Sequence, residues 1–235
     1  MPYEGISETM SKKVFIHYVR HGTTLFNRIG RMQGWSDSPL EEEGISQARE
    51  ARETLKDIPF RKAYTSTSER CVDTAHIILE GRDVPLVYTK KLKEISWGDY
   101  DGFLISNDPR EIDRRRFGDC DWTDVGGENP GIAIARAKEV YDQIYEESRD
   151  GDHILVVSHG AIMIHMMEKL MGIDLNRLFT IMQRKGQTGS PVSHGYAADI
   201  MIEDGAYHLL DLRGQDGLYE EYRKETMSYV KPYHV

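Results

Sequence analysis

Two short clusters of reactive residues stand out in the sequence, and each follows an apolar run. Arg20–Gly22 (Arg-His-Gly) comes after the run at 14–19, and Ser158–Gly160 (Ser-His-Gly) comes after the run at 154–157. An arginine offers a planar fork of N–H donors suited to phosphate or carboxylate. A histidine can act as a nucleophile, a general base or a metal ligand, and a glycine lets the backbone approach an anion closely. The clusters therefore suggest an anion site, the alternative being two exposed strand ends.

A further arginine, Arg70, has a position that favours the same chemistry. Residues 62–66 are typical of a short strand, and residues 67–79 are typical of a helix that begins with hydroxyl residues suited to N-caps. Free backbone N–H groups and the helix dipole make a first helical turn attractive to anions. An exposed arginine is the alternative, but its charge would oppose the dipole there, which favours a functional role for Arg70.

The elements that must position these residues alternate between strands and helices. Strands are predicted at 14–19, 62–66, 84–88 and 153–158, helices at 40–55, 67–79, 132–148 and 161–171, and a closing hairpin around the turn at 203–205. This order predicts βαβ units, hence an α/β fold with a mainly parallel sheet and an antiparallel edge. The carboxyl ends of parallel strands meet at one edge, where ligands bind. A single domain is expected over 13–213, after a disordered leader at 1–12 and before a tail at 214–235 whose structure the pattern does not predict.

Composition excludes several classes of protein. A net charge of −9 argues against a general nucleic-acid binder. Two cysteines, Cys71 and Cys120, are too few for a disulfide framework and lack a metal-binding spacing. No run is apolar and long enough for a signal peptide or a membrane span, so a cytoplasmic protein without a membrane partner is expected. His21 and His159 would be poor metal ligands beside arginines and without clustered carboxylates, so no metal is expected.

Five motifs, in order, resemble those of the histidine phosphatase superfamily, also called the phosphoglycerate mutase-like family. They are Arg20–Thr24 with Asn27, Arg31–Leu40, Arg70 followed by Thr74 and Ala75, Glu94 ahead of Gly98, and Ser158–Gly160. The resemblance extends from about residue 14 to residue 211. It implies a phosphoglycerate mutase-like three-layer α/β/α sandwich.

The resemblance also implies roles for individual residues. His21 would attack phosphorus and form a phosphohistidine, while Arg20, Arg70 and His159 hold the equatorial oxygens. Asn27 would lie near the same phosphate. Glu94 would donate a proton to the leaving oxygen and later accept one from water. Because the arginines would supply the positive charge that a metal supplies elsewhere, no metal or other cofactor is expected. Candidates for the substrate pocket are Gln33, Gly34, Trp97 and Arg114.

Three functions remain open at this stage. The first is a phosphomonoester hydrolase for a small phosphorylated metabolite, because the segment at 94–127 lacks the long basic insertion of cofactor-dependent phosphoglycerate mutases and 97–102 is similar to the version in broad phosphatases. The second is such a mutase, since the arginines at 114–116 could bind a second anionic group. The third is a phospho-ligand binding module without catalysis. Neither the natural substrate nor the oligomeric state follows from the sequence.

Overall fold

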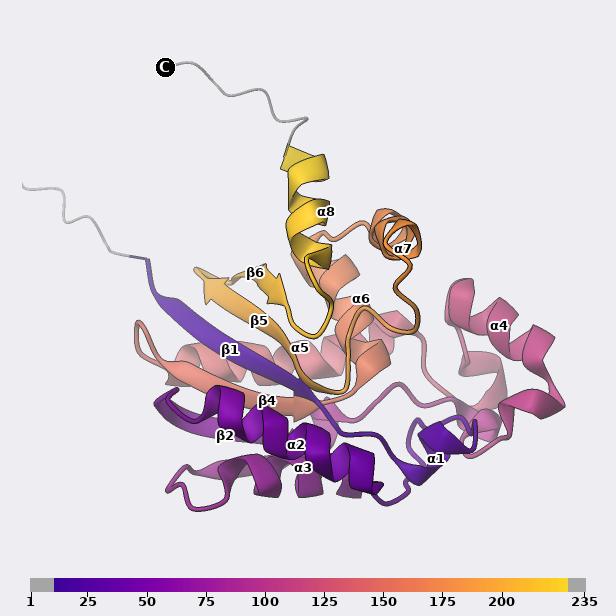
Figure 1. The fold of residues 1–235 in the computed structure, drawn as a ribbon, viewed down its shortest axis with the longest axis horizontal. Coiled ribbons are helices and arrows are strands. Elements are labelled where there is room, and N and C mark those ends of the chain that lie inside the picture. Colours follow the sequence, from indigo (N-terminus) through magenta and orange to yellow (C-terminus); the bar gives the residue numbers. More distant parts are fainter. Residues whose placement is uncertain (1–10, 228–235) are drawn as a thin grey trace, which may run out of the picture.

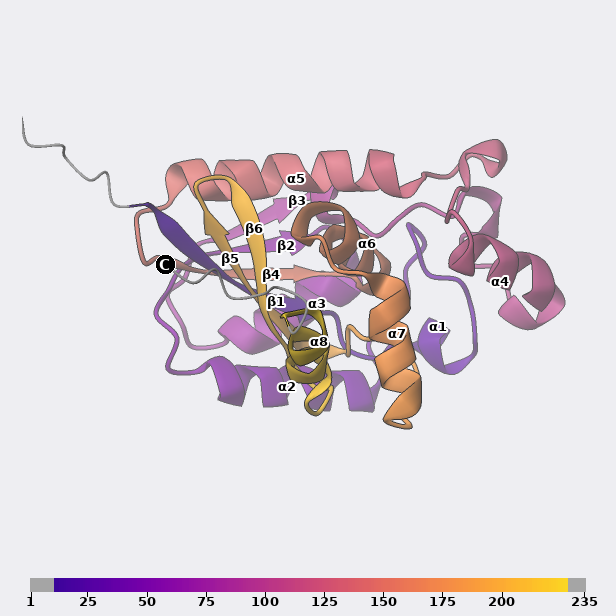
Figure 2. The ribbon, with the colours of Figure 1, turned by 90° about the horizontal axis from the view of Figure 1, so that it is seen from above.

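The computed structural model describes residues 11–227, and a six-stranded sheet lies at its centre (Figures 1 and 2). The strand order is β3-β2-β4-β1-β5-β6. The strands are β1 (Lys13–Arg20), β2 (Phe60–Ser66), β3 (Leu86–Thr89), β4 (His153–Ser158), β5 (Gly195–Glu203) and β6 (Ala206–Leu212). The first four pair in parallel, whereas β5 is antiparallel to both β1 and β6. The predicted mainly parallel sheet with an antiparallel edge is confirmed.

Helices cover both faces of this sheet. On β4, Ile154 and Val156 pack into the larger apolar core, whereas Leu155 and Val157 pack into a smaller one. Successive side chains of a strand point to opposite faces, so four consecutive buried residues need a layer on each side. In Figure 1, α2 (Glu42–Leu55) and α3 (Glu69–Leu79) lie below the sheet, and α5 (Pro130–Glu147) and α6 (Gly160–Met171) lie on the opposite face. The result is the expected three-layer α/β/α sandwich.

A smaller structural layer caps the end of the sheet where β1 and β4 finish. It contains α1 (Leu25–Arg28) and α4 (Pro109–Phe117), both at that end in Figures 1 and 2. It also contains short 3-10 helices at η1 (Lys90–Leu92), η2 (Gly98–Tyr100), η3 (Ile105–Asn107) and η4 (Thr123–Val125). A third apolar cluster holds the cap together and includes Trp97 and Trp122, whose rings meet edge to face at 5.2 Å. The cap therefore has a core of its own beside the edge at which the reactive clusters lie.

Two helices lie where the sequence analysis predicts none. They are α7 (Leu175–Arg184) and α8 (Leu218–Met227), and the second falls in the segment at 214–235. Both bury apolar residues in the larger core of the sandwich: Leu178, Ile181 and Met182 from α7, and Leu218, Tyr219 and Tyr222 from α8. The segment after 213 thus packs with the domain as far as α8. Of the predicted leader at 1–12, only Ser11 and Lys12 are among the described residues.

A buried polar cluster lies midway along β1. His17 Nδ1 is 2.8 Å from the Tyr196 hydroxyl and 3.0 Å from Asp199 Oδ1, and Arg213 Nε donates to Asp199 Oδ2 at 2.8 Å. Burial raises the pKa of Asp199, but hydrogen bonds from His17, Tyr196 and Arg213 outweigh it and lower that pKa to about 2. The carboxylate is therefore stabilised by the fold.

This cluster makes stability depend on pH. Because the folded pKa of Asp199 is about 2 and its ordinary value is 3.8, the carboxylate contributes stability that is complete above about pH 4 and is lost as the pH falls through about 2. We expect Asp199→Asn to lower the free energy of unfolding at neutral pH by about 2 kcal/mol. Urea unfolding at a series of pH values measures this. The gap to wild type should narrow in acid, and a gap independent of pH would contradict the assignment. Asp211→Asn, which removes an exposed partner of the same Arg213, is the matched control.

Candidate active site

The carboxyl ends of β1 and β4 bring the two predicted clusters together. Arg20 on β1 lies opposite Ser158 on β4 in the parallel register. The residues that follow, His21 and His159, are both buried, and their ring centroids are 5.3 Å apart. The two imidazoles therefore share one site, as the sequence predicts from two parallel strands.

The hydrogen bonds of His21 determine which of its nitrogens is free. Nδ1 lies 2.9 Å from the carbonyl oxygen of Gly22, which can only accept, so Nδ1 carries the proton. Nε2 then has the lone pair, and it has no hydrogen-bond partner among the described residues. Burial lowers the pKa of His21 well below its ordinary value, and the positive charges of Arg70 and Arg20 lower it further. The imidazole is thus neutral near pH 7, the form in which it can act as a nucleophile.

One donor group of Arg20 binds a backbone carbonyl, and another has no partner among the described residues. Its Nη1 donates to the carbonyl oxygen of Val192 at 2.8 Å, while its Nε is buried without a partner in the described part of the chain. A Cβ on Gly160 would lie only 3.0 Å from the Cζ and Nε of Arg20. The glycine of the Ser-His-Gly cluster is therefore required because the guanidinium packs directly against its backbone.

Arg70 is fully buried in the first turn of α3. Its Nη1 donates to the Ser36 carbonyl at 3.1 Å and to Asp37 Oδ1 at 2.8 Å, and its Nη2 donates to the Gly34 carbonyl at 3.0 Å. Its Nε is buried and has no partner among residues 11–227. The loop before α2 thus fixes the orientation of the guanidinium and leaves one buried N–H available to a ligand.

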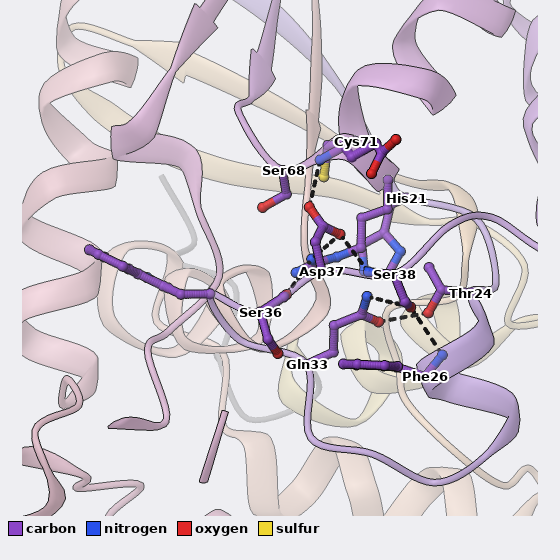
Figure 3. A network of polar contacts seen from close by, with 12 residues as sticks. His21, Thr24, Phe26, Gln33, Ser36, Asp37, Ser38, Ser68 and Cys71 are labelled. Atoms are coloured by element: carbon purple, nitrogen blue, oxygen red, sulfur yellow. Dashed lines mark hydrogen bonds and ion pairs between the residues drawn. The ribbon is translucent and has the colours of Figure 1, made fainter. Parts of the chain in front are cut away.

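Asp37 joins this loop to the start of α3, as Figure 3 shows. Its Oδ2 accepts the backbone N–H of Glu69 at 2.6 Å, while its Oδ1 binds Arg70. The carboxylate also lies beside the positive end of the α3 dipole. Asp37 is therefore a positioning residue for Arg70, and the sequence analysis missed it because one acidic residue in a turn-rich loop has no distinguishing pattern.

The loop candidates Gln33 and Gly34 and the nearby Asn27 occupy different places. Gln33 bridges two hydroxyl groups, accepting from Thr24 Oγ1 at 2.6 Å and donating to Ser38 Oγ at 3.0 Å (Figure 3), and it lines the cavity described below. Gly34 supplies a carbonyl to Arg70 and does not line that cavity. Asn27 lines the cavity, and its Oδ1 accepts the Thr24 backbone N–H at 3.1 Å while its amide nitrogen has no partner in the described residues. Asn27 therefore offers a free amide donor to the cavity.

His159 is held by two polar partners. Arg70 Nη2 donates to its Nδ1 at 3.0 Å, so Nε2 of the neutral ring carries the proton and donates to Ser66 Oγ at 2.8 Å. Burial lowers the pKa of His159 well below its ordinary value, with Arg70 adding to the effect. Both ring nitrogens of His159 thus have protein partners, and the ring lies against the guanidinium of Arg70 and next to His21.

Glu94 is buried at the amino end of α6. Its Oε2 accepts the backbone N–H of Ala161 at 2.9 Å, and its Oε1 accepts those of Ile162 at 2.9 Å and Ile95 at 3.0 Å. Three backbone donors therefore fix the carboxyl group in one orientation. Glu94 lines the same cavity as Arg20 and His21, so a group capable of proton transfer faces the same space as the free histidine nitrogen.

A cavity of about 1730 Å³ opens over part of this cluster, while Arg70 and His159 lie behind its lining residues and are not among them. One end is formed by Arg20, His21, Asn27 and Glu94, and the walls come from the cap on one side and from α6 and α7 on the other. The candidate Trp97 lines it and also belongs to the core of the cap. The space is far larger than a phosphate group needs, so the site can hold a sizeable group attached to the phosphate.

The candidate Arg114 is not part of this cavity, which corrects the prediction for this residue. It is exposed on α4 and pairs with Glu111. Its neighbour Arg115 is buried between Glu111 and Asp124. Arg116 lines the cavity instead and has no ion pair among the described residues. Residues two positions apart on a helix point roughly 200° apart, so Arg114 and Arg116 cannot both face the cavity.

A third histidine, which the sequence analysis missed, also lies at this site. His194 precedes β5, lines the cavity and has its ring centroid 5.6 Å from that of His21. No local pattern could identify it, because β5 joins the site only by pairing with β1 across the length of the domain.

Two further predictions from the sequence concern metal binding and membrane spans. Among residues 11–227, no three or more His, Cys, Asp and Glu side chains are arranged to hold a metal ion. None of the helices in that part of the chain is long and apolar enough to cross a membrane.

Comparison with known proteins identifies the family of this chain. Residues 16–196 match the model of the histidine phosphatase superfamily, branch 1. The chain is 30% identical over 172 residues to the adenosylcobalamin/alpha-ribazole phosphatase of Salmonella typhimurium, covering 72% of this chain and 85% of that protein. It is 32% identical over 222 residues to a 2,3-bisphosphoglycerate-dependent phosphoglycerate mutase of Bradyrhizobium sp. (strain BTAi1), covering 87% of this chain and 100% of that one.

A solved structure is also similar to this chain. The phosphoglycerate mutase of Bacillus anthracis is 27% identical and superimposes with a TM-score of 0.71, covering 91% of this chain and 98% of that one. The names of these three proteins are those of a phosphatase and two phosphoglycerate mutases, all of them enzymes. The chain therefore belongs to branch 1 of the histidine phosphatase superfamily, a family of enzymes whose fold it shares.

Proposed function

We propose that this chain is a phosphomonoester hydrolase that acts through a phosphohistidine on His21. One observation carries the proposal: a neutral imidazole with a free Nε2 lies beside two arginines that each keep a buried, unpartnered Nε. Phosphoryl transfer needs an in-line nucleophile and positive charge on the equatorial oxygens. The site has both.

The first step transfers the phosphoryl group to the enzyme. His21 Nε2 attacks phosphorus, the P–N bond forms and the P–O bond to the leaving group breaks. Arg20 and Arg70 stabilise the charge on the equatorial oxygens through charge-assisted hydrogen bonds, with the free amide of Asn27 as a further donor. Glu94, which lines the same cavity, donates a proton to the departing oxygen.

The second step regenerates the enzyme. Water attacks the phosphohistidine, a P–O bond forms and the P–N bond breaks, which returns the electron pair to His21 Nε2. Glu94, left as a carboxylate by the first step, accepts the proton from water. The three backbone N–H groups that hold Glu94 keep it in one place for both proton transfers.

The shape of the cavity favours a large leaving group. Beyond the phosphate end, its walls carry apolar side chains, including Phe117 from the cap, Ile164 from α6 and Phe179 from α7. A three-carbon acid would leave most of the 1730 Å³ filled with water. We therefore propose a phosphomonoester whose leaving group is bulky and partly apolar.

A phosphoglycerate mutase is the second candidate, and one observation favours it. Arg116 lines the cavity without an ion pair in the described residues and could bind the carboxylate or second phosphate of such a substrate. The similarity to mutases is as high as that to the phosphatase. The difference between the two functions lies in whether water or a second substrate receives the phosphoryl group.

One set of assays separates these functions. Phosphate release from naphthyl phosphate, glycerol phosphate and 3-phosphoglycerate should show a clear preference for the aryl ester. Interconversion of phosphoglycerates that depends on bisphosphoglycerate and exceeds hydrolysis would establish the mutase instead. Absence of turnover, together with thermal stabilisation by phosphate, would indicate a binding module.

The role of Glu94 gives a prediction about leaving groups. We expect Glu94→Gln to lower kcat/KM for alkyl phosphates by about 10²-fold, but for activated aryl phosphates by less than about 10-fold, because only poor leaving groups need a proton. Comparing kcat/KM isolates the first transfer, and Glu111→Gln on α4 is the control. Equal losses for both ester classes would remove Glu94 from the role of general acid.

A further inference from the structure

His194 has a structural position that the mechanism above does not use. It immediately precedes Gly195, the first residue of β5, which lies opposite Arg20 in the antiparallel register with β1. Gly195 has φ +80°, a backbone conformation that glycine adopts without strain. The turn thus delivers His194 to the strand end that carries Arg20 and His21.

The contacts of His194 suggest which nitrogen carries its proton. Nδ1 is 3.5 Å from Thr23 Oγ1. The same hydroxyl also contacts Gln47, either accepting from Nε2 at 3.1 Å or donating to Oε1 at 3.2 Å, and it can donate to His194 only in the first arrangement. In that arrangement Nδ1 is the acceptor and the proton of the neutral ring lies on Nε2, which is the tautomer that a phosphoryl oxygen at Nε2 would select.

That Nε2 is buried and has no hydrogen-bond partner in the described part of the chain. A buried polar group without a partner costs free energy, and native structures contain few of them. His194 shares this condition with the Nε atoms of Arg20 and Arg70, which are also buried and without a partner in the described residues. The site therefore has three buried N–H groups near the imidazole of His21 that one ligand could bind together.

The charge state of His194 fits a donor role. Burial and the positive charge of Arg20 lower the pKa of His194 to about 3. The ring is therefore neutral near pH 7 and keeps one N–H. A neutral donor can bind a phosphoryl oxygen without adding to the repulsion among the cations already present.

We propose that His194 is a further phosphate-binding residue, whose Nε2–H donates a hydrogen bond to an oxygen of the phosphoryl group as it transfers to and from His21. The inference rests on the proposed phosphohistidine chemistry and adds a donor that the family motifs in this sequence do not include. The bond satisfies an N–H that is unpaired in the free protein, so ligand binding removes an existing cost. The same donor serves both transfer steps, because the nonbridging oxygens stay in place while the axial groups exchange.

Two pairs of variants test the donor. His194→Phe keeps a ring without a donor, whereas His194→Gln can place an amide N–H near the position of Nε2. His194→Gln and His194→Asn form the second pair. Neither side chain has an aromatic ring, and the Asn side chain is too short to place its amide near the position of Nε2. His76→Phe, at an exposed position on α3, is the matched control. The readouts are the dissociation constant of orthovanadate, kcat/KM for an aryl phosphate, and the thermal stability of the free protein.

We expect His194→Phe and His194→Asn to lower kcat/KM by about 10²-fold and to weaken vanadate binding by about 10-fold or more. The free protein should melt near the wild-type temperature, and His194→Gln should recover at least about 10-fold of the lost kcat/KM. The inference is overturned if wild type binds vanadate and turns over but His194→Phe matches it, or if Gln, Asn and Phe are equally impaired, since then only the shape of the imidazole matters. A wild-type protein that neither binds vanadate nor releases phosphate would instead overturn the proposed function itself.

Discussion

Alanine at His21 should abolish phosphoryl transfer. We expect kcat for any phosphomonoester to fall by at least about 10⁴-fold, because the variant cannot form the covalent intermediate and the remaining groups only bind and polarise the substrate. Incubation of wild type with a radiolabelled aryl phosphate, followed by an alkaline quench that preserves phosphohistidine, should label the protein. Digestion and mass spectrometry should place the label on the peptide that contains His21, and the variant should remain unlabelled.

The site around His21 provides the control for this loss. Arg20, Arg70 and their supporting bonds do not depend on the His21 side chain, so the variant should still bind vanadate within about 10-fold of wild type. His208→Ala, at an exposed position on β6, should have wild-type activity and labelling. Turnover that persists in His21→Ala, or a label found on another residue, would contradict the mechanism.

Alanine at Arg70 should cause the second largest loss. Removing one charged clamp on a transferring phosphoryl group costs on the order of 3–4 kcal/mol of barrier, which is about 10²–10³-fold in kcat/KM. The loss should exceed the effect of the Nε donor alone, because Arg70 also orients His159 through Nη2. Arg70→Lys should restore little of it, since an ammonium cannot reproduce the planar fork that joins Asp37, the Gly34 carbonyl and the ligand.

Stability must be separated from catalysis in this experiment, because Arg70 is fully buried. Arg82→Ala is a suitable control: that arginine also donates to backbone carbonyl groups, at Leu55 and Ile58, but lies outside the cavity. It should lower the melting temperature and leave kcat/KM unchanged. Near-normal turnover by a folded Arg70→Ala protein would show that Arg70 does not bind the transferring group.

Asp37→Asn tests how far phosphoryl binding by Arg70 depends on the ion pair between Asp37 and Arg70. The amide keeps the size of the carboxylate but removes the charge that holds Nη1 of Arg70 at 2.8 Å. Because Asp37 does not line the cavity, its effect on catalysis is indirect, through Arg70 and through the backbone of Ser38 and Glu69 that it also binds. The loss should therefore be smaller than that of Arg70→Ala.

The sequence alone determined which strands and helices carry the reactive residues. Arg20 and His21 follow one buried strand, Ser158 and His159 follow another, and both strands precede helices. Parallel βαβ units place such strand ends at one edge for local and topological reasons. The meeting of His21 with His159 could therefore be predicted before the fold was known.

Other features could not be predicted, because they depend on which way a helix faces or on where a distant segment packs. The arginine triplet indicated positive charge near the substrate, but the orientation of α4 directs Arg114 toward Glu111 and solvent, and Arg116 toward the cavity. A helix turned by two residues, about 200°, would reverse that result. Likewise, α8 became part of the fold because its apolar residues pack into the larger core, which is a contact between distant segments.

Local pattern thus specified the residues able to do the chemistry, because each lies next to the strand or helix end that presents it. Tertiary packing alone decided how those residues are held and which others join them. Asp37 supports Arg70 from a loop 33 residues away, and His194 reaches His21 only because β5 pairs with β1. Contacts between segments so far apart depend on the whole chain folding into one core, and no short stretch of sequence records them.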